Sequence, residues 1–347
     1  MGDLVVSLRI PPMPRIPFQE LFETLQHVLL KCGFEGERAA QCARLFAETS
    51  RDGVYSHGLN RFPLFIAMTR SGVVDIHAEP KLVASTGPVE RWDGHIGPGN
   101  LNAYHCMQRA ITLSAQFGVG TVALANTNHW MRGGSYGWQA ADAGVIGICW
   151  TNTCPNLPPW GAREPRLGNN PLVIAVPRAD GAVVLDMAMS QFSYGALASY
   201  RTRGELLPVE GGFDAEGELT RQPAAIEASK RPLPIGYWKG SGLALMLDLV
   251  AGILAAGQTT FQIPPEPERE THLSQVFIAL DPKRLDPIHA ASDIADAVIQ
   301  HFRSPEHAQG EQVRYPGEQV LQTRRENLVK GVPVDPAIWR QVQELKR

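Results

Sequence analysis

Strand patterns that are almost wholly apolar alternate with helix patterns along most of this chain. Gly118–Ala125 and Val145–Asn152 lack the polar residue at every second position that a half-exposed strand carries, which indicates strands covered on both faces. Each follows a stretch with apolar residues at helical spacing, Asn100–Phe117 and Ser135–Asp142. This alternation predicts an α/β fold in which helices cover both faces of a sheet.

The same periodicities predict the remaining elements. Further helices are expected over Phe18–Cys32, Glu37–Ser50, Tyr194–Arg203, Gly242–Ala256, Ile294–Phe302 and Pro336–Leu345, and further strands over Lys81–Ser85, Val89–Asp93, Pro171–Val176, Ala182–Met187 and Gln275–Leu280. A short helix is expected between Gly58 and Gly72, and a polar loop over Gly212–Pro223. Gly242–Ala256 is apolar nearly all round, which predicts a helix buried in the core.

The 347 residues are enough to bury a large core without disulfides or metals. We expect an extension over residues 1–13, a helical N-terminal segment over 14–75, a central α/β region over 76–290, and a C-terminal helical segment over 291–347 that packs against the N-terminal one.

Composition argues against several classes of protein. With 32 Lys and Arg against 35 Asp and Glu the net charge is −3, so a basic nucleic-acid binder is not expected. The most apolar stretch, Leu243–Ala256, contains Asp248 and is too short to span a bilayer, and the N-terminus does not read as a secretion signal. The odd count of five cysteines without a C-x-x-C pair predicts reduced, buried thiols, and the ten histidines form no zinc motif. We therefore expect a cytoplasmic protein without a metal site.

A Rossmann dinucleotide site is not expected either. The string Gly118–Ala123 has the right glycine spacing, but it leaves a helix and enters a strand, whereas the fingerprint requires the opposite order. The second string, Gly240–Leu245, opens a helix but no long strand precedes it. Lys239 and the glycines there are consistent with an anion site at the helix start, and equally with a plain helix start capped by Ser241.

Three polar clusters are candidates for a catalytic site. In the first, a helix would place His57 and Arg61 on one face beside Ser56. A proton donor that titrates near neutral pH, next to a bidentate clamp for a carboxylate, is what reduction of a 2-oxo acid requires. A purely structural histidine is the competing interpretation.

The second cluster follows a buried strand and carries His129 and Arg132, which are suited to the same two roles. The third is the Pro-, Gly- and Trp-rich loop between Thr151 and Asn170, where the glycines are also explained as turn formers.

At these clusters the sequence resembles the malate/L-lactate dehydrogenase family of NAD(P)-dependent oxidoreductases, which is distinct from the Rossmann-fold lactate dehydrogenases. The resemblance runs in order from about Phe18 to the C-terminus. The motifs that carry it are SHGLNRFP (56–63), NHWMRGGSYGWQAAD (128–142), GICWTN (147–152), PPWGA (158–162), GNNPL (168–172), LDMAMSQFSYG (185–195), GYWKGSGLAL (236–245) and RYPGE (314–318). The Trp-rich forms look most like the 2,3-diketo-L-gulonate reductase branch.

The resemblance implies a non-Rossmann, mixed-sheet α/β fold and a homodimer with active sites near the interface. It also implies that His57 donates the proton to the substrate oxygen, that Ser56 orients the His57 ring and that Arg61 binds the substrate carboxylate. Some relatives give the proton transfer to the histidine that corresponds to His129. The residues that would contact the cofactor, NADH in preference to NADPH, are Ala182, Val183, Val184, Leu185, Asp186, Met187, Ala188, Trp238, Lys239, Gly317, Glu318 and Gln319. Of these, Asp186 is suited to ribose hydroxyls, Lys239 to phosphate and Trp238 to stacking.

The sequence thus predicts an oxidoreductase acting on CH-OH donors that transfers hydride to the C2 carbonyl of a sugar-derived 2-oxo acid, with 2,3-diketo-L-gulonate as the leading substrate. The alternatives are another substrate of the same family (a malate- or lactate-type acid, ureidoglycolate or a cyclic imine) and a catalytically inactive dimeric binding protein. Two departures from the family's sequence pattern bear on the preference for particular cofactors and substrates. Ala188-Met189-Ser190 stands where Ala-Thr-Ser is common in the family, and Gly168-Asn169-Asn170-Pro171 where Gly-Thr-Asn-Pro is common.

Overall fold

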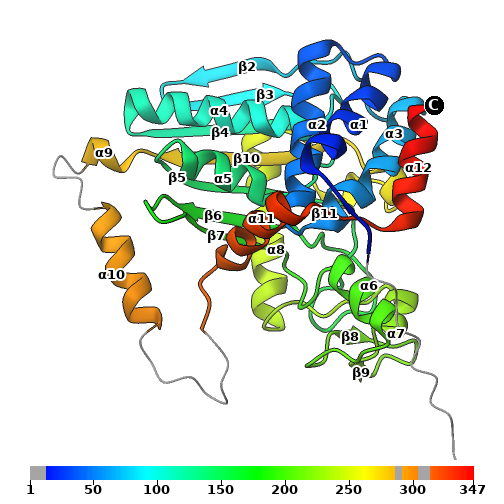
Figure 1. Ribbon diagram of the computed structural model, residues 1–347. Coiled ribbons are helices and arrows are strands. Elements are labelled where there is room, and N and C mark those ends of the chain that lie inside the picture. Colours follow the sequence, from blue (N-terminus) through cyan, green and yellow to red (C-terminus); the bar gives the residue numbers. More distant parts are fainter. Residues whose placement is uncertain (1–12, 286–290, 304–312) are drawn as a thin grey trace, which may run out of the picture.

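The computed structural model describes residues 13–285, 291–303 and 313–347, so the expected N-terminal extension lies outside the described residues apart from Met13. A seven-stranded mixed sheet forms the centre of the molecule, with the strand order β2-β3-β4-β10-β5-β6-β7 (Figure 1). Its strands are β2 (Lys81–Thr86), β3 (Val89–Asp93), β4 (Val119–Thr127), β5 (Ile146–Thr151), β6 (Leu172–Val176), β7 (Val183–Met187) and β10 (Leu273–Leu280). The expected mixed-sheet α/β fold is confirmed.

The pairing of these strands is mostly antiparallel. Within the described part of the sheet, β3 and β4 form the one parallel pair, joined through helix α4 (Gly99–Phe117). Strand β10 lies between β4 and β5 and is antiparallel to both, with Val276 opposite Ala123 on one side and Trp150 on the other. A strand from late in the chain therefore completes the centre of the sheet.

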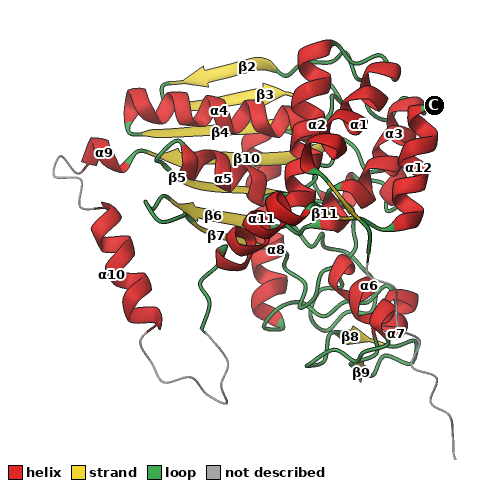
Figure 2. Ribbon diagram, in the orientation of Figure 1, coloured by secondary structure: helices red, strands yellow, loops and turns green. Residues whose placement is uncertain are grey.

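Helices cover both faces of the sheet, as the apolar strands require. Helices α4 and α5 (Gly134–Asp142) pack on one face and α8 (Trp238–Ala255) packs on the other, as Figure 2 shows by the helices in front of and behind the strands. The first face buries a core that includes Met107, Trp130 and Phe277. The second buries a core between α8 and the strands that includes Trp150.

The prediction that Gly242–Ala256 is buried all round is wrong. Only one face of α8 packs on the sheet, while Leu245, Met246, Leu249 and Ile253 are exposed, Ile253 at 73 %. Within the described residues α8 is also the helix whose length and apolar composition would suit a membrane span. However, its Asp248 is buried and accepts hydrogen bonds from Asn152 and from the backbone of Thr260, which is the environment of a core helix.

A second, helical core lies beside the sheet. Helices α1 (Phe18–Lys31), α2 (Gly36–Arg51), α3 (Phe62–Arg70) and α12 (Pro336–Lys346) pack around Phe46, Phe62 and Phe65. Next to them, helix α11 (Glu318–Lys330) packs on α2, and the short strands β1 (Arg15–Ile16) and β11 (Val332–Pro333) pair with each other. The first described residues thus lie beside the segment that leads into α12.

A small lobe with its own apolar centre of Leu197, Leu207 and Ile226 lies below the sheet in Figure 1. It comprises α6 (Tyr194–Arg203), β8 (Gly212–Phe213), β9 (Leu219–Thr220) and α7 (Pro223–Ser229). The expected polar loop over Gly212–Pro223 therefore contains a short hairpin, whose two-residue strands are too short to leave a periodic signal. The remaining helices are α9 (Pro282–Leu285) and α10 (Ala291–Arg303), and α10 is tied to the main body by ion pairs of Asp296 with Arg178 and of Arg303 with Glu318.

The topology brings five chain segments to one edge of the sheet. Because β10 runs antiparallel to β4 and β5, its first residue Leu273 lies opposite Thr127, the last residue of β4. In the same way Leu172, at the start of β6, lies opposite both Trp150 near the end of β5 and Met187 at the end of β7. Side chains just beyond these strand ends meet at this edge.

Candidate active site

A cavity of about 1150 Å³ opens at this edge of the sheet. It lies between the sheet, the helical core and the small lobe. Its wall includes His57, Arg61, His129, Asp186, Glu270 and Gly317. The cavity is at the upper end of the size range of small-molecule sites, so it has room for a dinucleotide and a small acid together.

His57 and Arg61 reach this cavity from two 3₁₀ turns, Tyr55–His57 and Leu59–Arg61, and not from one helix as the sequence predicted. Gly58 joins the turns. A Cβ at Gly58 would lie 2.2 Å from Ser50 Oγ and 2.8 Å from Ser50 N, so a side chain does not fit there. Ser50 Oγ in turn accepts the N–H of Leu59 at 2.8 Å. This tight packing on α2 fixes the direction of both functional side chains.

The imidazoles of His57 and His129 stack on each other, with ring centroids 5.8 Å apart and 21° between the planes. Ser56 Oγ lies 2.9 Å from His57 Nδ1, the contact expected of a residue that orients the ring. His129 Nδ1 accepts the N–H of Met131 at 3.0 Å, so a neutral His129 carries its proton on Nε2. The two predicted histidines therefore form one site.

Burial lowers the pKa of both rings. It is the main cause of the lowered pKa of His57, which the charge of Asp186 opposes and the charges of Arg61 and Arg132 reinforce. The pKa of His129 lies well below its usual value of 6.5, again chiefly through burial and then through Arg61 and His57. Both histidines are neutral near pH 7 in this state.

Arg61 lies in the cavity with its guanidinium 3.8 Å from the carboxylate of Glu270. No hydrogen bond joins Arg61 to another side chain in the described part of the protein at shorter range. Its donors are therefore available to an incoming carboxylate.

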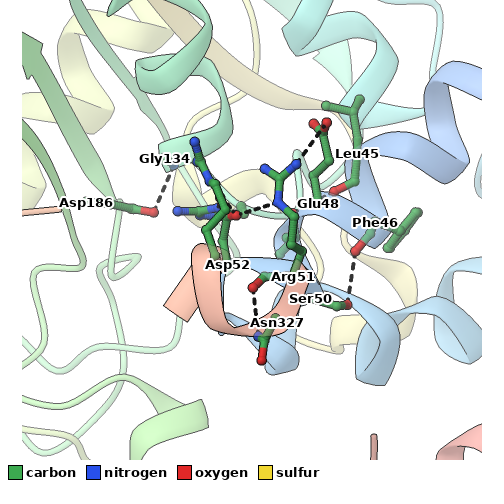
Figure 3. Close-up of polar contacts among 12 residues, drawn as sticks. Leu45, Phe46, Glu48, Ser50, Arg51, Asp52, Gly134, Asp186 and Asn327 are labelled. Atoms are coloured by element: carbon green, nitrogen blue, oxygen red, sulfur yellow. Dashed lines mark hydrogen bonds and ion pairs between the residues drawn. The ribbon is translucent and has the colours of Figure 1, made fainter. Parts of the chain in front are cut away.

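Arg132, which the sequence made an alternative to Arg61, is paired with a buried carboxylate. Its Nη1 donates to the buried carboxylate of Asp52 at 2.7 Å. Arg324 binds the same carboxylate through two hydrogen bonds of 2.8 and 2.7 Å, and Arg51 donates at 2.9 Å. Figure 3 shows the contact between Arg51 and Asp52. Despite burial, these guanidinium groups lower the pKa of Asp52 to about 2.

Asp186 lies near the end of β7 and lines the cavity. Its Oδ2 accepts the N–H of Gly134 at the start of α5 at 2.8 Å (Figure 3). Because its charge raises the pKa of His57 against burial, it lies near the proposed proton donor. The sequence suggested that Asp186 binds ribose hydroxyls, and in the structure its charge also acts on the pKa of His57.

The proposed cofactor residues divide into two sets. Those on the cavity wall are Val184, Leu185, Asp186, Ala188 and Gly317. Those outside the wall are Ala182, Val183, Met187, Glu318 and Gln319, together with Trp238 and Lys239, both exposed at the start of α8.

Gly317, before α11, lines the cavity and packs closely on β7. It has φ = +93°, and a Cβ there would lie 3.0 Å from the backbone nitrogen of Val184. The nearby buried Nε of Arg132 and Nε1 of Trp138 have no partner among the described residues. A large cavity with unpaired buried donors in its wall fits a polar dinucleotide.

The third predicted cluster is chiefly structural. Gly168 is required because a Cβ would lie 2.1 Å from the amide oxygen of Asn170. That oxygen accepts the N–H of Thr153, and the amide group donates to Ala244 O in α8. Asn169 nevertheless lines the cavity. Ser241 is not a helix cap, since α8 begins at Trp238 and Ser241 Oγ accepts the N–H of Trp160.

The sequence reasoning missed part of the cavity wall. Glu270 precedes β10, Ser193 and Tyr194 come from the small lobe, and Arg314 and Tyr315 precede α11. A signal existed for four of these residues: Ser193 and Tyr194 lie inside the motif LDMAMSQFSYG, and Arg314 and Tyr315 lie inside RYPGE. Glu270 stands in a polar loop without any motif, so only the sheet order brings it to the site.

Within the described residues, no group of three or more His, Cys, Asp or Glu side chains is arranged to hold a metal ion. The five cysteines are free thiols, and all but Cys32 are buried.

Comparison with known proteins gives consistent relatives. The family model described as malate/L-lactate dehydrogenase matches residues 16–343. A 2,3-diketo-L-gulonate reductase of Escherichia coli O6:K15:H31 (strain 536) is 45 % identical over 332 residues, 95 % of this chain and 100 % of that protein.

Two solved structures share the fold over nearly the whole chain. Sulfolactate dehydrogenase from Methanocaldococcus jannaschii has a TM-score of 0.88 and 27 % identity, and the match covers 96 % of each chain. Delta1-piperideine-2-carboxylate reductase from Pseudomonas syringae pvar. tomato has a TM-score of 0.84 and 28 % identity, and the match covers 96 % of this chain and 99 % of that one.

Proposed function

Since this chain belongs to the malate/L-lactate dehydrogenase family of oxidoreductases, we propose that it reduces the C2 carbonyl of a sugar-derived 2-oxo acid with a nicotinamide cofactor. The leading substrate is 2,3-diketo-L-gulonate, the substrate in the name of its 45 % identical relative. The observation that carries this proposal is the meeting of His57, His129 and Arg61 in one large cavity.

Each residue of the site has a separate role in the reduction. Arg61 binds the substrate carboxylate through its free donors, which places the neighbouring C2 carbonyl oxygen toward the stacked histidines. His57 gives the proton to that oxygen, with Ser56 holding its Nδ1. His129, protonated on Nε2 when neutral, donates a hydrogen bond and is the reserve candidate for proton transfer.

Asp186 helps His57 to carry a proton. A general acid must be protonated when the substrate arrives, and burial works against this for His57. The charge of Asp186 favours the protonated ring, and binding of an anionic substrate adds to that effect.

The cofactor would be held by the cavity wall of Val184, Leu185, Asp186, Ala188 and Gly317. When bound, the reduced nicotinamide supplies the hydride. We propose NADH in preference to NADPH, which a direct comparison of kcat/KM with the two cofactors tests.

We also propose that the enzyme is a homodimer. The exposed apolar face of α8 supports this, because such a surface is usually covered by a partner. Trp238 and Lys239 begin the same helix and are exposed outside the cavity of their own chain. If they contact the cofactor, they reach that of the partner subunit, which would place the active sites near the interface. We propose a cytoplasmic location, which the free thiols support.

The test is consumption of NADH, followed by its absorbance, with 2,3-diketo-L-gulonate, pyruvate, oxaloacetate, the 2-oxo acid that corresponds to ureidoglycolate, and a cyclic imine acid. We expect the highest kcat/KM for 2,3-diketo-L-gulonate. Preferred turnover of another compound would overturn the substrate and keep the family chemistry. If no compound turns over and NADH does not quench the tryptophan fluorescence, the chain is a binding protein and the proposal is wrong.

A further inference from the structure

Glu270 is a buried carboxylate in the proposed substrate site. It is only 3 % exposed and lies just before β10 on the cavity wall. Its Oε1 accepts the N–H of Cys154 at 3.0 Å, which anchors the side chain to the end of β5. Its Oε2 faces Arg61 at 3.8 Å, and the Cys154 thiol also contacts the carboxylate. One oxygen is therefore anchored to the backbone, and the other faces Arg61 in the cavity.

Few positive charges near Glu270 are available to neutralise a second anionic group of the substrate. Of the cavity cations, Arg132 is bound to Asp52, whereas Lys230 and Arg314 are exposed at the rim. Among the described wall residues, Arg61 is thus the interior cation available to the substrate, and it already faces Glu270. Asp186 and Glu227 add two more carboxylates to the wall.

Before the substrate binds, both histidines of the wall are neutral near pH 7 and add no positive charge. The proton that His57 takes up with the substrate is then given to the carbonyl oxygen, so it does not remain to neutralise a second carboxylate. A substrate with one carboxylate can share Arg61 with Glu270. A second carboxylate would enter a confined site where fixed negative charges repel it.

Building on the proposed function, we propose that Glu270 is a specificity-determining residue that selects 2-oxo acids with a single negative charge over dicarboxylates. Its Oε2, which faces Arg61 in the cavity, accepts hydrogen bonds from substrate hydroxyl groups, so the same oxygen favours a hydroxylated chain and disfavours a second carboxylate. The substrate class is therefore a monoanionic, polyhydroxylated 2-oxo acid.

The experiment compares the variant Glu270→Gln with the wild-type protein and with Glu268→Gln. Glutamine keeps the shape of the side chain and an acceptor for Cys154, and it removes the charge. Glu268 is an exposed residue of the same loop and is not on the cavity wall, so its variant has the same change in net charge away from the site. The quantity measured is the ratio of kcat/KM for 2,3-diketo-L-gulonate to that for oxaloacetate.

We expect Glu270→Gln to lower this ratio by about tenfold or more, through a gain with oxaloacetate and a loss with the hydroxylated acid. Glu268→Gln should leave it within about twofold of the wild type, as expected for an exposed charge. A ratio unchanged in Glu270→Gln, or lowered equally in Glu268→Gln, overturns the inference.

Binding without turnover separates this inference from the proposed reaction. Calorimetry with D-gluconate and L-malate, each in the presence of NAD⁺, gives two dissociation constants that need no chemical step. We expect the wild-type protein to bind gluconate more tightly, and Glu270→Gln to shift the ratio toward malate by about tenfold. If the ratio shifts in this way but no 2-oxo acid is turned over, the proposed reaction is wrong and the role of Glu270 stands. Absence of gluconate binding to the wild type, or an unshifted ratio, would overturn the role of Glu270.

Discussion

At the scale of single residues, burial decides what each histidine of the site can do. His57 and His129 stack on each other, but Asp186 acts on the pKa of His57 and not on that of His129. His129 is also tied to the Met131 backbone through Nδ1. His57 is therefore the ring that gains a proton more readily, and His129 the ring suited to a fixed, neutral hydrogen-bond donor.

His57→Asn should lower kcat by roughly 10²–10⁴-fold, the usual effect of removing a well-placed general acid. The affinity for NADH, measured by quenching of tryptophan fluorescence, should stay within about twofold, because His57 acts on the substrate oxygen. The exposed His77 offers a control, since His77→Asn changes the same residue type far from the cavity wall. If the His57→Asn variant keeps a high kcat but binds NADH poorly, His57 has a structural role and His129 is the proton donor.

Arg61→Lys should raise the KM for the 2-oxo acid by about tenfold, because a point cation replaces the planar fork that binds a carboxylate through two hydrogen bonds. The KM for NADH should change little. Steady-state kinetics with both substrates varied measures the two constants. An unchanged KM for the oxo acid would show that another group binds the carboxylate.

The lowered histidine pKa values also make stability depend on pH. Below pH 6.5 the unfolded chain binds protons that buried His57 and His129 do not bind, so stability falls as the pH drops from 6.5 toward their folded pKa values. Urea unfolding at about pH 7 and about pH 5 should show this loss, with each histidine contributing at most about 1.4 kcal/mol for every pH unit below its unfolded pKa. His129→Gln should make the loss smaller. An equal loss of stability in the variant would mean that His129 does not cause it. Asp52, with a pKa of about 2, titrates below this pH range and does not contribute to the loss.

At the scale of elements, Asp52 holds three parts of the chain around the site. It stands at the end of α2 and binds Arg132, which precedes α5, and Arg324 in α11. The guanidinium of Arg324 also lies over the ring of Trp138 in α5, 4.6 Å from its centre. Through these contacts Asp52 holds two parts of the cavity wall: His129, three residues before Arg132, and Gly317, just before α11.

Asp52→Asn should destabilise the protein by about 3–5 kcal/mol, because it leaves the buried Arg132 and the partly buried Arg324 without their counter-charge. Chemical denaturation measures the change in the free energy of unfolding. Asp180→Asn is the matched control, since that exposed carboxylate faces Arg178 at 3.7 Å and should contribute less than about 1 kcal/mol. Similar effects of the two variants would contradict a central role for Asp52.

At the scale of the whole molecule, α8 has one face in the core and one face in solvent. The inner face packs on the sheet through small residues such as Ala244 and Ala251. The outer face presents Met246, Leu249 and Ile253, which favours a partner subunit over solvent.

Ile253→Glu should convert the proposed dimer to a monomer, because it places a charge in an apolar interface. Light scattering coupled to gel filtration measures the mass. Val329→Glu makes the same change at an 85 % exposed position of α11 and should leave the dimer intact. A wild-type protein that is monomeric, or an Ile253→Glu variant that stays dimeric, would contradict this interface.

Residues that are neighbours in the chain were enough to define the elements and the local site motifs. The apolar patterns of β4 and β5 and the helix over Tyr194–Arg203 depend on such neighbours, and so do the Ser56-His57 contact and the place of His129 after a strand. How these parts meet depends on the complete fold. It places β10 between β4 and β5, which carries Glu270 to the side of Arg61, and it leaves half of α8 exposed. Such pairings join residues more than a hundred positions apart, and they depend on how whole surfaces pack, which no local pattern records.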